Sequence, residues 1–219
     1  MADPRLHLLH LSSPALPVGA YAYSQGLEYA IEEGWVDGPA LRSWLSDGLA
    51  LGLSQLDLPI ILRAHAATLA ENEPTLSEWN DCILANRETR ELLLEDQQIG
   101  AALWRLLASL QSPTLPILRQ APGYAIAFAV AAARWQISAA DASSAFCYSW
   151  LENQVTAATK LVPLGQTEAQ KLLLGLLEEI PDACASAADL EDDDIGLSLA
   201  GLALASSLHE HQHTRLFRS

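Results

Sequence analysis

Apolar side chains recur along almost the whole chain at the spacing of an α-helix. After Pro39, for example, one helix face would carry Leu41, Trp44, Leu45, Leu49 and Gly52. Because side chains three and four positions apart share a helix face, this spacing predicts a helix that buries one side. No segment shows the alternation of a strand, and no repeat or low-complexity linker interrupts the pattern. The sequence therefore predicts an all-α fold, a single-domain bundle of roughly nine to ten helices over residues 1–219.

Helix start and stop signals divide this pattern into segments. We expect helices at about residues 5–11, 24–33, 39–70, 75–110, 124–135, 138–159, 167–180 and 195–208. Ser24, Thr75 and Ser138 are the expected N-caps, since their side-chain oxygens can accept a backbone N–H of the first turn. Prolines mark the expected breaks, with Pro59 and Pro181 bending or ending helices and Pro113 and Pro116 lying in a loop.

The charge balance excludes several classes of partner. The chain has 27 acidic and 12 basic residues, a net charge of −15 and a pI near 4.6. Nucleic acids and anionic membrane surfaces attract basic proteins, so neither is an expected partner. A strongly acidic protein is instead suited to meeting cations or basic partners.

Cysteine usage and apolar runs predict a cytoplasmic protein. Cys82, Cys147 and Cys184 are far apart and never form a C-x-x-C pair, so neither a disulfide framework nor a cysteine zinc site is indicated. We expect a reducing cytosol as the compartment. The first ten residues lack the apolar run of a signal peptide, and the longest apolar stretch, residues 121–133, is too short to span a bilayer.

The segment from His209 to His213 matches the zinc-protease pattern H-E-x-x-H. On a helix the two outer histidines would share a face, with Glu210 as the base. The chain ends six residues later, which leaves no downstream third ligand, and so short a match arises easily by chance. Polar surface is the favoured interpretation, and we expect no metal site, no cofactor site and no catalytic residue.

Three other segments have unusual compositions. The loop at residues 16–28 carries two tyrosines and two glycines, and a second apolar loop at residues 160–166 carries Lys160. The last five residues, 215–219, combine two arginines with Leu216 and Phe217. Large apolar side chains at an exposed terminus indicate docking on a partner, although the tail could also pack back on its own domain.

Four segments together resemble the UreF family of urease accessory proteins. They are LPVGAYAYSQGLE at 16–28, CILANRETREL at 82–92, KLVPLGQTEAQ at 160–170 and HEHQHTRLFRS at 209–219. The resemblance implies an all-helical homodimer that binds UreD (also called UreH), the GTPase UreG and then urease apoprotein. It implies a non-enzymatic chaperone for nickel insertion, with nickel as cargo and GTP bound by the partner.

The resemblance also implies partner-binding residues. The family's C-terminal end supports the UreD contact and the dimer, and that role falls on Arg215, Leu216, Phe217 and Arg218. The face for the GTPase falls on the two loops, at Pro17, Gly19, Tyr21, Ser24, Gly26, Glu28, Lys160, Pro163 and Gly165. We expect segments 1–23 and 209–219 to be docking segments.

Some alternatives remain open at this stage. Arg87, Glu88 and Arg90 could form an internal ion network instead of a partner contact. A helical metalloenzyme using the C-terminal histidines, or a helical interaction protein unrelated to urease, would also fit the composition. Of the charged residues in the two loops, Lys160 and Glu28 are the ones expected to lie at the rim of the GTPase contact.

Overall fold

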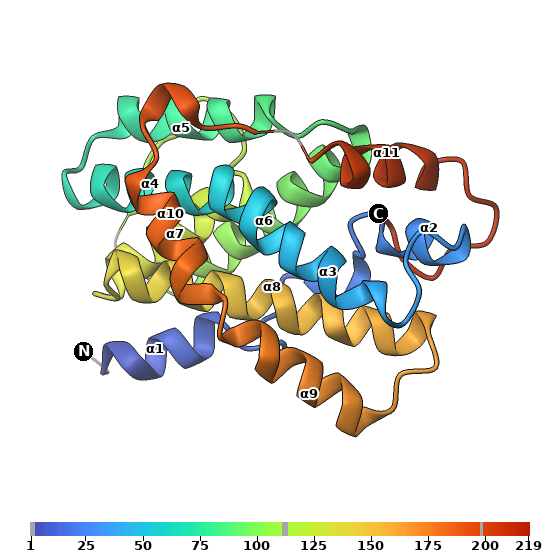
Figure 1. The fold of residues 1–219 in the computed structure, drawn as a ribbon. Coiled ribbons are helices and arrows are strands. Elements are labelled where there is room, and N and C mark those ends of the chain that lie inside the picture. The colour runs from blue at the N-terminus through green and yellow to red at the C-terminus, as the bar shows by residue number, and fades with distance from the viewer. Residues whose placement is uncertain (1–2, 111–113, 198) are drawn as a thin grey trace.

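The structure, a computed structural model, describes residues 3–110, 114–197 and 199–219, and within them helices joined by loops and turns occur without any strand (Figure 1). The prediction of an all-α fold is confirmed. The helices are α1 (Pro4–Leu11), α2 (Leu27–Glu32), α3 (Ala40–Asp47), α4 (Asp57–Leu69), α5 (Glu73–Ala85), α6 (Arg90–Ser109), α7 (Tyr124–Arg134), α8 (Ala139–Leu161), α9 (Gln166–Leu177), α10 (Ile180–Asp189) and α11 (Ala200–His209). Pro113, expected in the loop before α7, lies outside the described residues.

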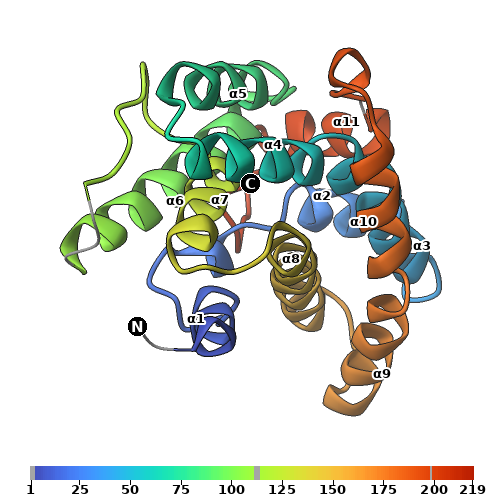
Figure 2. The same cartoon turned by 90° about the vertical axis from the view of Figure 1, so that its left-hand side faces the viewer.

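Helix α7 forms the centre of the core. Every residue from Ala125 to Ala132 is fully buried, and α4, α6 and α8 all pack against this helix. The alanines allow neighbouring helices to approach closely, and Phe128 fills the space between them with Tyr124 and Phe146 against its ring. Helix α5 lies outside α4, and α1 covers the ends of α7 and α8 (Figure 2).

The expected helix at residues 39–70 is interrupted earlier than Pro59. A π-helical turn at Gly48–Gly52 and a 3₁₀ turn at Leu53–Gln55 separate α3 from α4. Pro59 then occupies the first turn of α4, where its missing N–H has no intrahelical partner to lose. The prediction that Pro59 breaks the helix is therefore wrong, although a break does occur nearby.

Pro181 also starts a helix instead of ending one. It lies in the first turn of α10, a helix that the sequence pattern did not predict, since the expected helix at 167–180 was to end there. Helix α5 likewise begins at Glu73, two residues before the expected cap, because the Asn72 side chain accepts the N–H of Thr75. The Ser138 cap of α8 is confirmed, since its hydroxyl accepts the N–H of Asp141 at 3.1 Å.

One stretch of the described chain, residues 40–69, is long and apolar enough to cross a membrane if only its length and composition are considered. Of its most apolar window, 61% is buried inside the protein. Such burial is typical of core helices, and Leu45, Leu58 and Ile61 from this stretch are fully buried.

Candidate functional site

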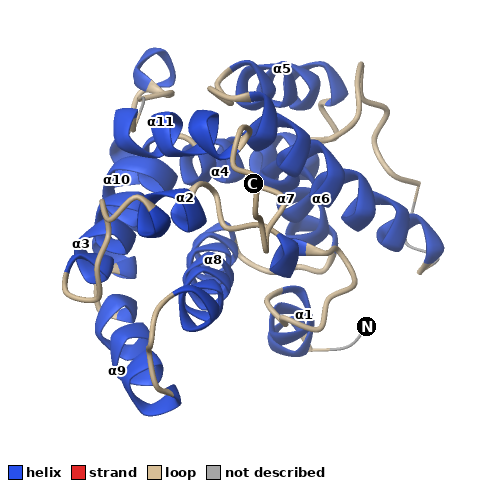
Figure 3. Cartoon of the chain, turned by 90° about the vertical axis from the view of Figure 1, so that its right-hand side faces the viewer, coloured by secondary structure: helices blue, strands red, loops and turns tan. Residues whose placement is uncertain are grey.

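The C-terminal tail, residues 209–219, folds back onto the loop at residues 16–28. Its backbone pairs with that loop, since Arg218 N–H donates to Ala22 at 2.8 Å and Ser24 N–H donates to Ser219 at 2.9 Å. The Ser24 hydroxyl adds a bond of 2.6 Å to the same Ser219 carbonyl. The end of the chain consequently lies between α2 and α6, with Ser219 fully buried (Figure 3).

Glu28 anchors the middle of the tail. Its carboxylate accepts the backbone N–H of Leu216 at 2.7 Å and that of Phe217 at 3.0 Å. The side chain lies in the first turn of α2, where the helix dipole favours a negative charge. Only 4% of Glu28 is exposed, so the prediction that it lies at an accessible rim is wrong.

A buried histidine joins this anchor to a second carboxylate. His209, the last residue of α11, places Nε2 3.1 Å from Glu28 Oε2 and Nδ1 2.7 Å from Glu91 Oε2. Glu91 in turn accepts a bond of 2.8 Å from Arg215. Buried carboxylates are costly unless they are paired, and here each is paired with a group of the tail.

The tail is partly buried and partly exposed. Phe217 is 5% exposed, and the Lys160 ammonium lies 5.3 Å from the centroid of its ring. Leu216, by contrast, is 68% exposed. The expectation of an exposed Phe217 is wrong, because this ring packs back on its own domain, whereas Leu216 remains accessible as expected.

The predicted partner-binding residues divide in the same way. Ser24, Gly26, Glu28 and Phe217 are buried, so they support the face from within and do not offer their side chains to a partner. The remaining ones lie wholly or partly at the surface: Pro17, Gly19, Tyr21, Lys160, Pro163, Gly165, Arg215, Leu216 and Arg218. We call these exposed residues the composite face, since they come from three separate parts of the chain.

Gly26 explains why the loop fits beneath α11. Its φ of +78° is a conformation that side chains with a Cβ rarely adopt. A Cβ at this position would also lie 2.7 Å from the backbone nitrogen of Ser206 in α11. Gly26 is the N-cap residue of α2. The Ser24 hydroxyl donates to Ser219 and still accepts the N–H of Glu28, in the first turn of α2, at 3.3 Å.

Comparison with known protein sequences identifies the family of this chain. The UreF family model matches residues 36–177. The urease accessory protein UreF of Teredinibacter turnerae is 51% identical, with all of both chains aligned. The chain belongs to the UreF family. UreF of Chromohalobacter salexigens is also 51% identical, over 97% of this chain and 93% of that protein, and UreF of Alkalilimnicola ehrlichii is 46% identical over 97% and 94%. The expectation of a protein unrelated to urease is thereby excluded.

Beneath the composite face, this UreF chain buries another carboxylate. Glu95 of α6 accepts the Ser219 hydroxyl at 2.6 Å and the Gln25 amide at 2.8 Å. Gln25 is held in turn by the indole N–H of Trp150 at 2.7 Å. Burial raises the pKa of Glu95 to about 7. The network therefore carries a group that titrates near neutral pH.

The sequence interpretation missed Glu91, Glu95 and His209 as parts of this site. The missed signal was spacing, because Glu91 and Glu95 lie four residues apart and align with the buried Ile99 on one face of α6. Acidic side chains on an otherwise apolar helix face indicate buried partners. The partners themselves lie more than 100 residues away, which no local pattern shows.

The segment at residues 82–92 forms an internal ion network around Arg87. Its guanidinium donates to Asp57 at 2.5 Å and to Asp96 at 3.1 Å, which supports the internal alternative for this residue of the UreF chain. A cavity of about 140 Å³ lies beside the network, and the Nε of Arg87 and the Oδ2 of Asp96 have no hydrogen-bond partner among the described residues. Arg90 differs, since it is exposed and lies 3.6 Å from Glu210.

The H-E-x-x-H pattern does not form a helix face in this UreF chain. Helix α11 ends at His209, so His213 lies beyond the helix and is exposed. Both ring nitrogens of His209 already contact carboxylates. Across the described residues, no three His, Cys, Asp or Glu side chains are grouped to hold a metal ion. The geometry required for a zinc protease is absent from this segment.

Proposed function

We propose that this chain is a non-catalytic accessory protein of urease maturation that acts as a scaffold. In this proposal it binds UreD and the GTPase UreG, works as a homodimer in the cytoplasm, and helps deliver nickel to urease apoprotein. The support is family membership, since its relatives at 43–51% identity are named urease accessory proteins.

The observation that carries the proposal is the composite face. Buried hydrogen bonds join the first loop to the tail, with Ser24 and Ser219 195 residues apart in sequence, and Lys160 of the second loop lies against the ring of Phe217. Tyr21 and Leu216 are each 68% exposed, and large apolar side chains on a rigid base are typical anchors of protein interfaces.

The charge of this face also favours a protein partner. Lys160, Arg215 and Arg218 place positive charge on it in a chain whose net charge is −15. Such a local contrast orients an approaching partner that offers acidic groups. We propose that this face contacts UreD through the tail and UreG through the loops.

The nucleotide and the metal are assigned to other components of the complex. The sequence contains no G-x-x-x-x-G-K-[ST] loop to hold a nucleoside triphosphate, so GTP would be bound by UreG. Nickel is cargo in this proposal and not a resident cofactor. The chain would then change GTP turnover by positioning its partner.

Co-purification with UreD and UreG tests the proposal. Leu216→Asp places a charge at the centre of the exposed tail and should abolish UreD binding, while Lys160→Ala should weaken recruitment of UreG. Leu69→Asp is the matched control, because Leu69 is 64% exposed at the end of α4, remote in sequence and structure from the composite face.

The outcomes separate the proposal from its rivals. Parental binding of UreD by Leu216→Asp would place the interface elsewhere. Failure of the parent chain to bind either partner, with the protein folded, would overturn the scaffold role. Stoichiometric tightly bound zinc together with hydrolytic activity would overturn the non-catalytic assignment.

A further inference from the structure

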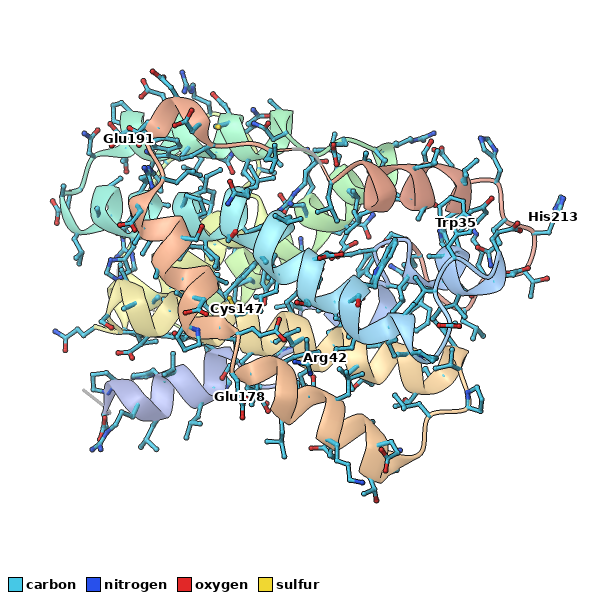
Figure 4. The ribbon with its side chains drawn as sticks, in the orientation of Figure 1. Trp35, Arg42, Cys147, Glu178, Glu191 and His213 are labelled. Carbon is cyan, nitrogen blue, oxygen red and sulfur yellow. The ribbon has the colours of Figure 1, made fainter. Side chains whose placement is uncertain are left out.

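Two of the three cysteines meet where α8 crosses α10. Cys147, labelled in Figure 4, lies on α8, and Cys184 lies on α10, a helix that packs directly against α8. Ser144 lies one turn before Cys147 on the same face of α8, and its hydroxyl is 3.9 Å from the Cys184 sulfur. The two thiols lie near enough to shift each other's pKa, and both cysteines are unbridged.

The two thiols have different surroundings. Cys147 is fully buried, whereas Cys184 is partly exposed, so a small reagent from solvent reaches Cys184 first. The neighbouring Cys147 thiol lowers the pKa of Cys184, which favours its thiolate. The neighbouring Cys184, together with burial, raises the pKa of Cys147. The pair thus combines an accessible nucleophile with a protected neighbour.

Cys82 provides an internal comparison. It lies on α5, its sulfur accepts the Asn86 side-chain amide at 3.7 Å, and burial raises its pKa. Since the thiolate is the reactive form of cysteine, Cys82 should react more slowly than Cys184.

We propose that Cys184 and Cys147 form a peroxide-reactive site that closes reversibly into a disulfide between α10 and α8. The Cys184 thiolate attacks one oxygen of hydrogen peroxide, the O–O bond breaks, and hydroxide leaves and is protonated to water. Cys184 is then a sulfenic acid. The Cys147 sulfur, after losing its proton, attacks the sulfenic sulfur and expels hydroxide as a second water. Two thiols are oxidised by two electrons, and one peroxide is reduced to two waters.

The disulfide would be a redox modification and not a structural staple. Disulfides of cytosolic proteins are mostly transient, and a dithiol reductant would regenerate both thiols by exchange while becoming a disulfide itself. Closure would fix α10 against α8, the helix that carries Lys160 at its C-terminal end.

Mass spectrometry of the purified, reduced protein tests the site. After exposure to a small molar excess of hydrogen peroxide, the intact mass should fall by two hydrogen atoms, and a non-reducing peptide map should contain one Cys147–Cys184 linked pair. Dithiothreitol should restore the original mass. Cys147→Ser should instead accumulate a sulfenic acid on Cys184, which dimedone traps.

Two further variants decide the assignment. Cys184→Ser should show neither the linked pair nor a dimedone adduct at Cys147, and Cys82→Ser should react as the parent does. The proposal is overturned if the parent keeps its mass under these conditions, if Cys82 appears in the linked peptide, or if Cys184→Ser is oxidised as fast as the parent. The reaction of the parent protein is the primary result. A variant that fails to fold therefore leaves the proposal open to refutation by the parent alone.

Discussion

Replacing Glu28 with alanine should detach the C-terminal tail while leaving the helical core folded. The substitution removes the acceptor for the backbone N–H groups of Leu216 and Phe217 and one carboxylate contact of His209. A buried polar group left without a partner costs about 1–3 kcal/mol. Three such groups would together cost several kcal/mol, a large fraction of the roughly 5–15 kcal/mol that stabilises a typical domain.

The tail can escape this cost by leaving its site. Release returns the N–H groups to water. It also exposes the Phe217 side chain, which loses about 1.5–3 kcal/mol of burial free energy. It also breaks the backbone bonds of Arg218 and Ser219, worth about 1 kcal/mol each. These losses, together with those of the side-chain bonds of Ser24, Arg215 and Ser219, set the upper limit of the damage. We therefore expect local opening of the tail and not global unfolding. Glu28→Gln, which keeps one acceptor oxygen, should have an intermediate effect.

Hydrogen–deuterium exchange measures this opening directly. The amides of Leu216, Phe217 and Arg218 are hydrogen-bonded in the parent and should exchange slowly. In Glu28→Ala their protection should fall by about 100-fold or more, since each 1.4 kcal/mol is a factor of ten. Amides of the buried helix α7 should keep their parental rates. Unchanged protection of the tail amides in Glu28→Ala would refute the anchoring argument.

Three further substitutions test the site. Glu95→Gln should flatten the pH dependence of stability. Because the Glu95 pKa is raised from 4.5 to about 7, the native state binds the proton more tightly, and the parent should lose up to about 3 kcal/mol of stability as the pH rises from 5 to 8. Stabilities from urea denaturation that change with pH in parallel for the two proteins would contradict this. Gly26→Ala should lower the melting temperature more than Gly19→Ala, because both glycines have positive φ but only Gly26 meets another backbone; equal losses would contradict the steric argument. His209→Ala should lower the free energy of unfolding, measured by urea denaturation, by more than about 1 kcal/mol, because His209 is buried. His213→Ala should change it by less than about 0.5 kcal/mol, because His213 is exposed. Equal effects would contradict this difference in burial.

Local signals in the sequence were sufficient to predict the fold class and most helices. The cap at Ser138 and the apolar run of α7 were predicted correctly, because both depend on residues within a few positions of each other. Predictions were wrong where one residue type fits two roles. Pro59 and Pro181 illustrate this, since proline both ends helices and occupies their first turn.

The organisation of the candidate site could be predicted only in part. Sequence motifs singled out the loops and the tail, which the structure does bring together. Whether Glu28 faces a partner or the protein's own interior depends on contacts 181 to 189 residues away. Composition was also misleading for Phe217, since its burial goes with contacts to Lys160 and Glu28, which are distant in sequence, and not with its neighbours in the chain.

Docking of the tail and binding of a partner should therefore be coupled. Leu216 and Arg218 can reach their positions on the composite face only while Glu28 and Ser24 hold the tail. If the docked tail is the binding-competent state, any loss in its population raises the apparent dissociation constant of the partner by the same factor. A bound partner would in turn stabilise the docked tail, by mass action. The two kinds of substitution then differ in a measurable way. Leu216→Asp removes a contact with the partner without freeing the tail, whereas Glu28→Ala weakens binding because the tail is released. In Glu28→Ala, a saturating concentration of the partner should restore the protection of the tail amides.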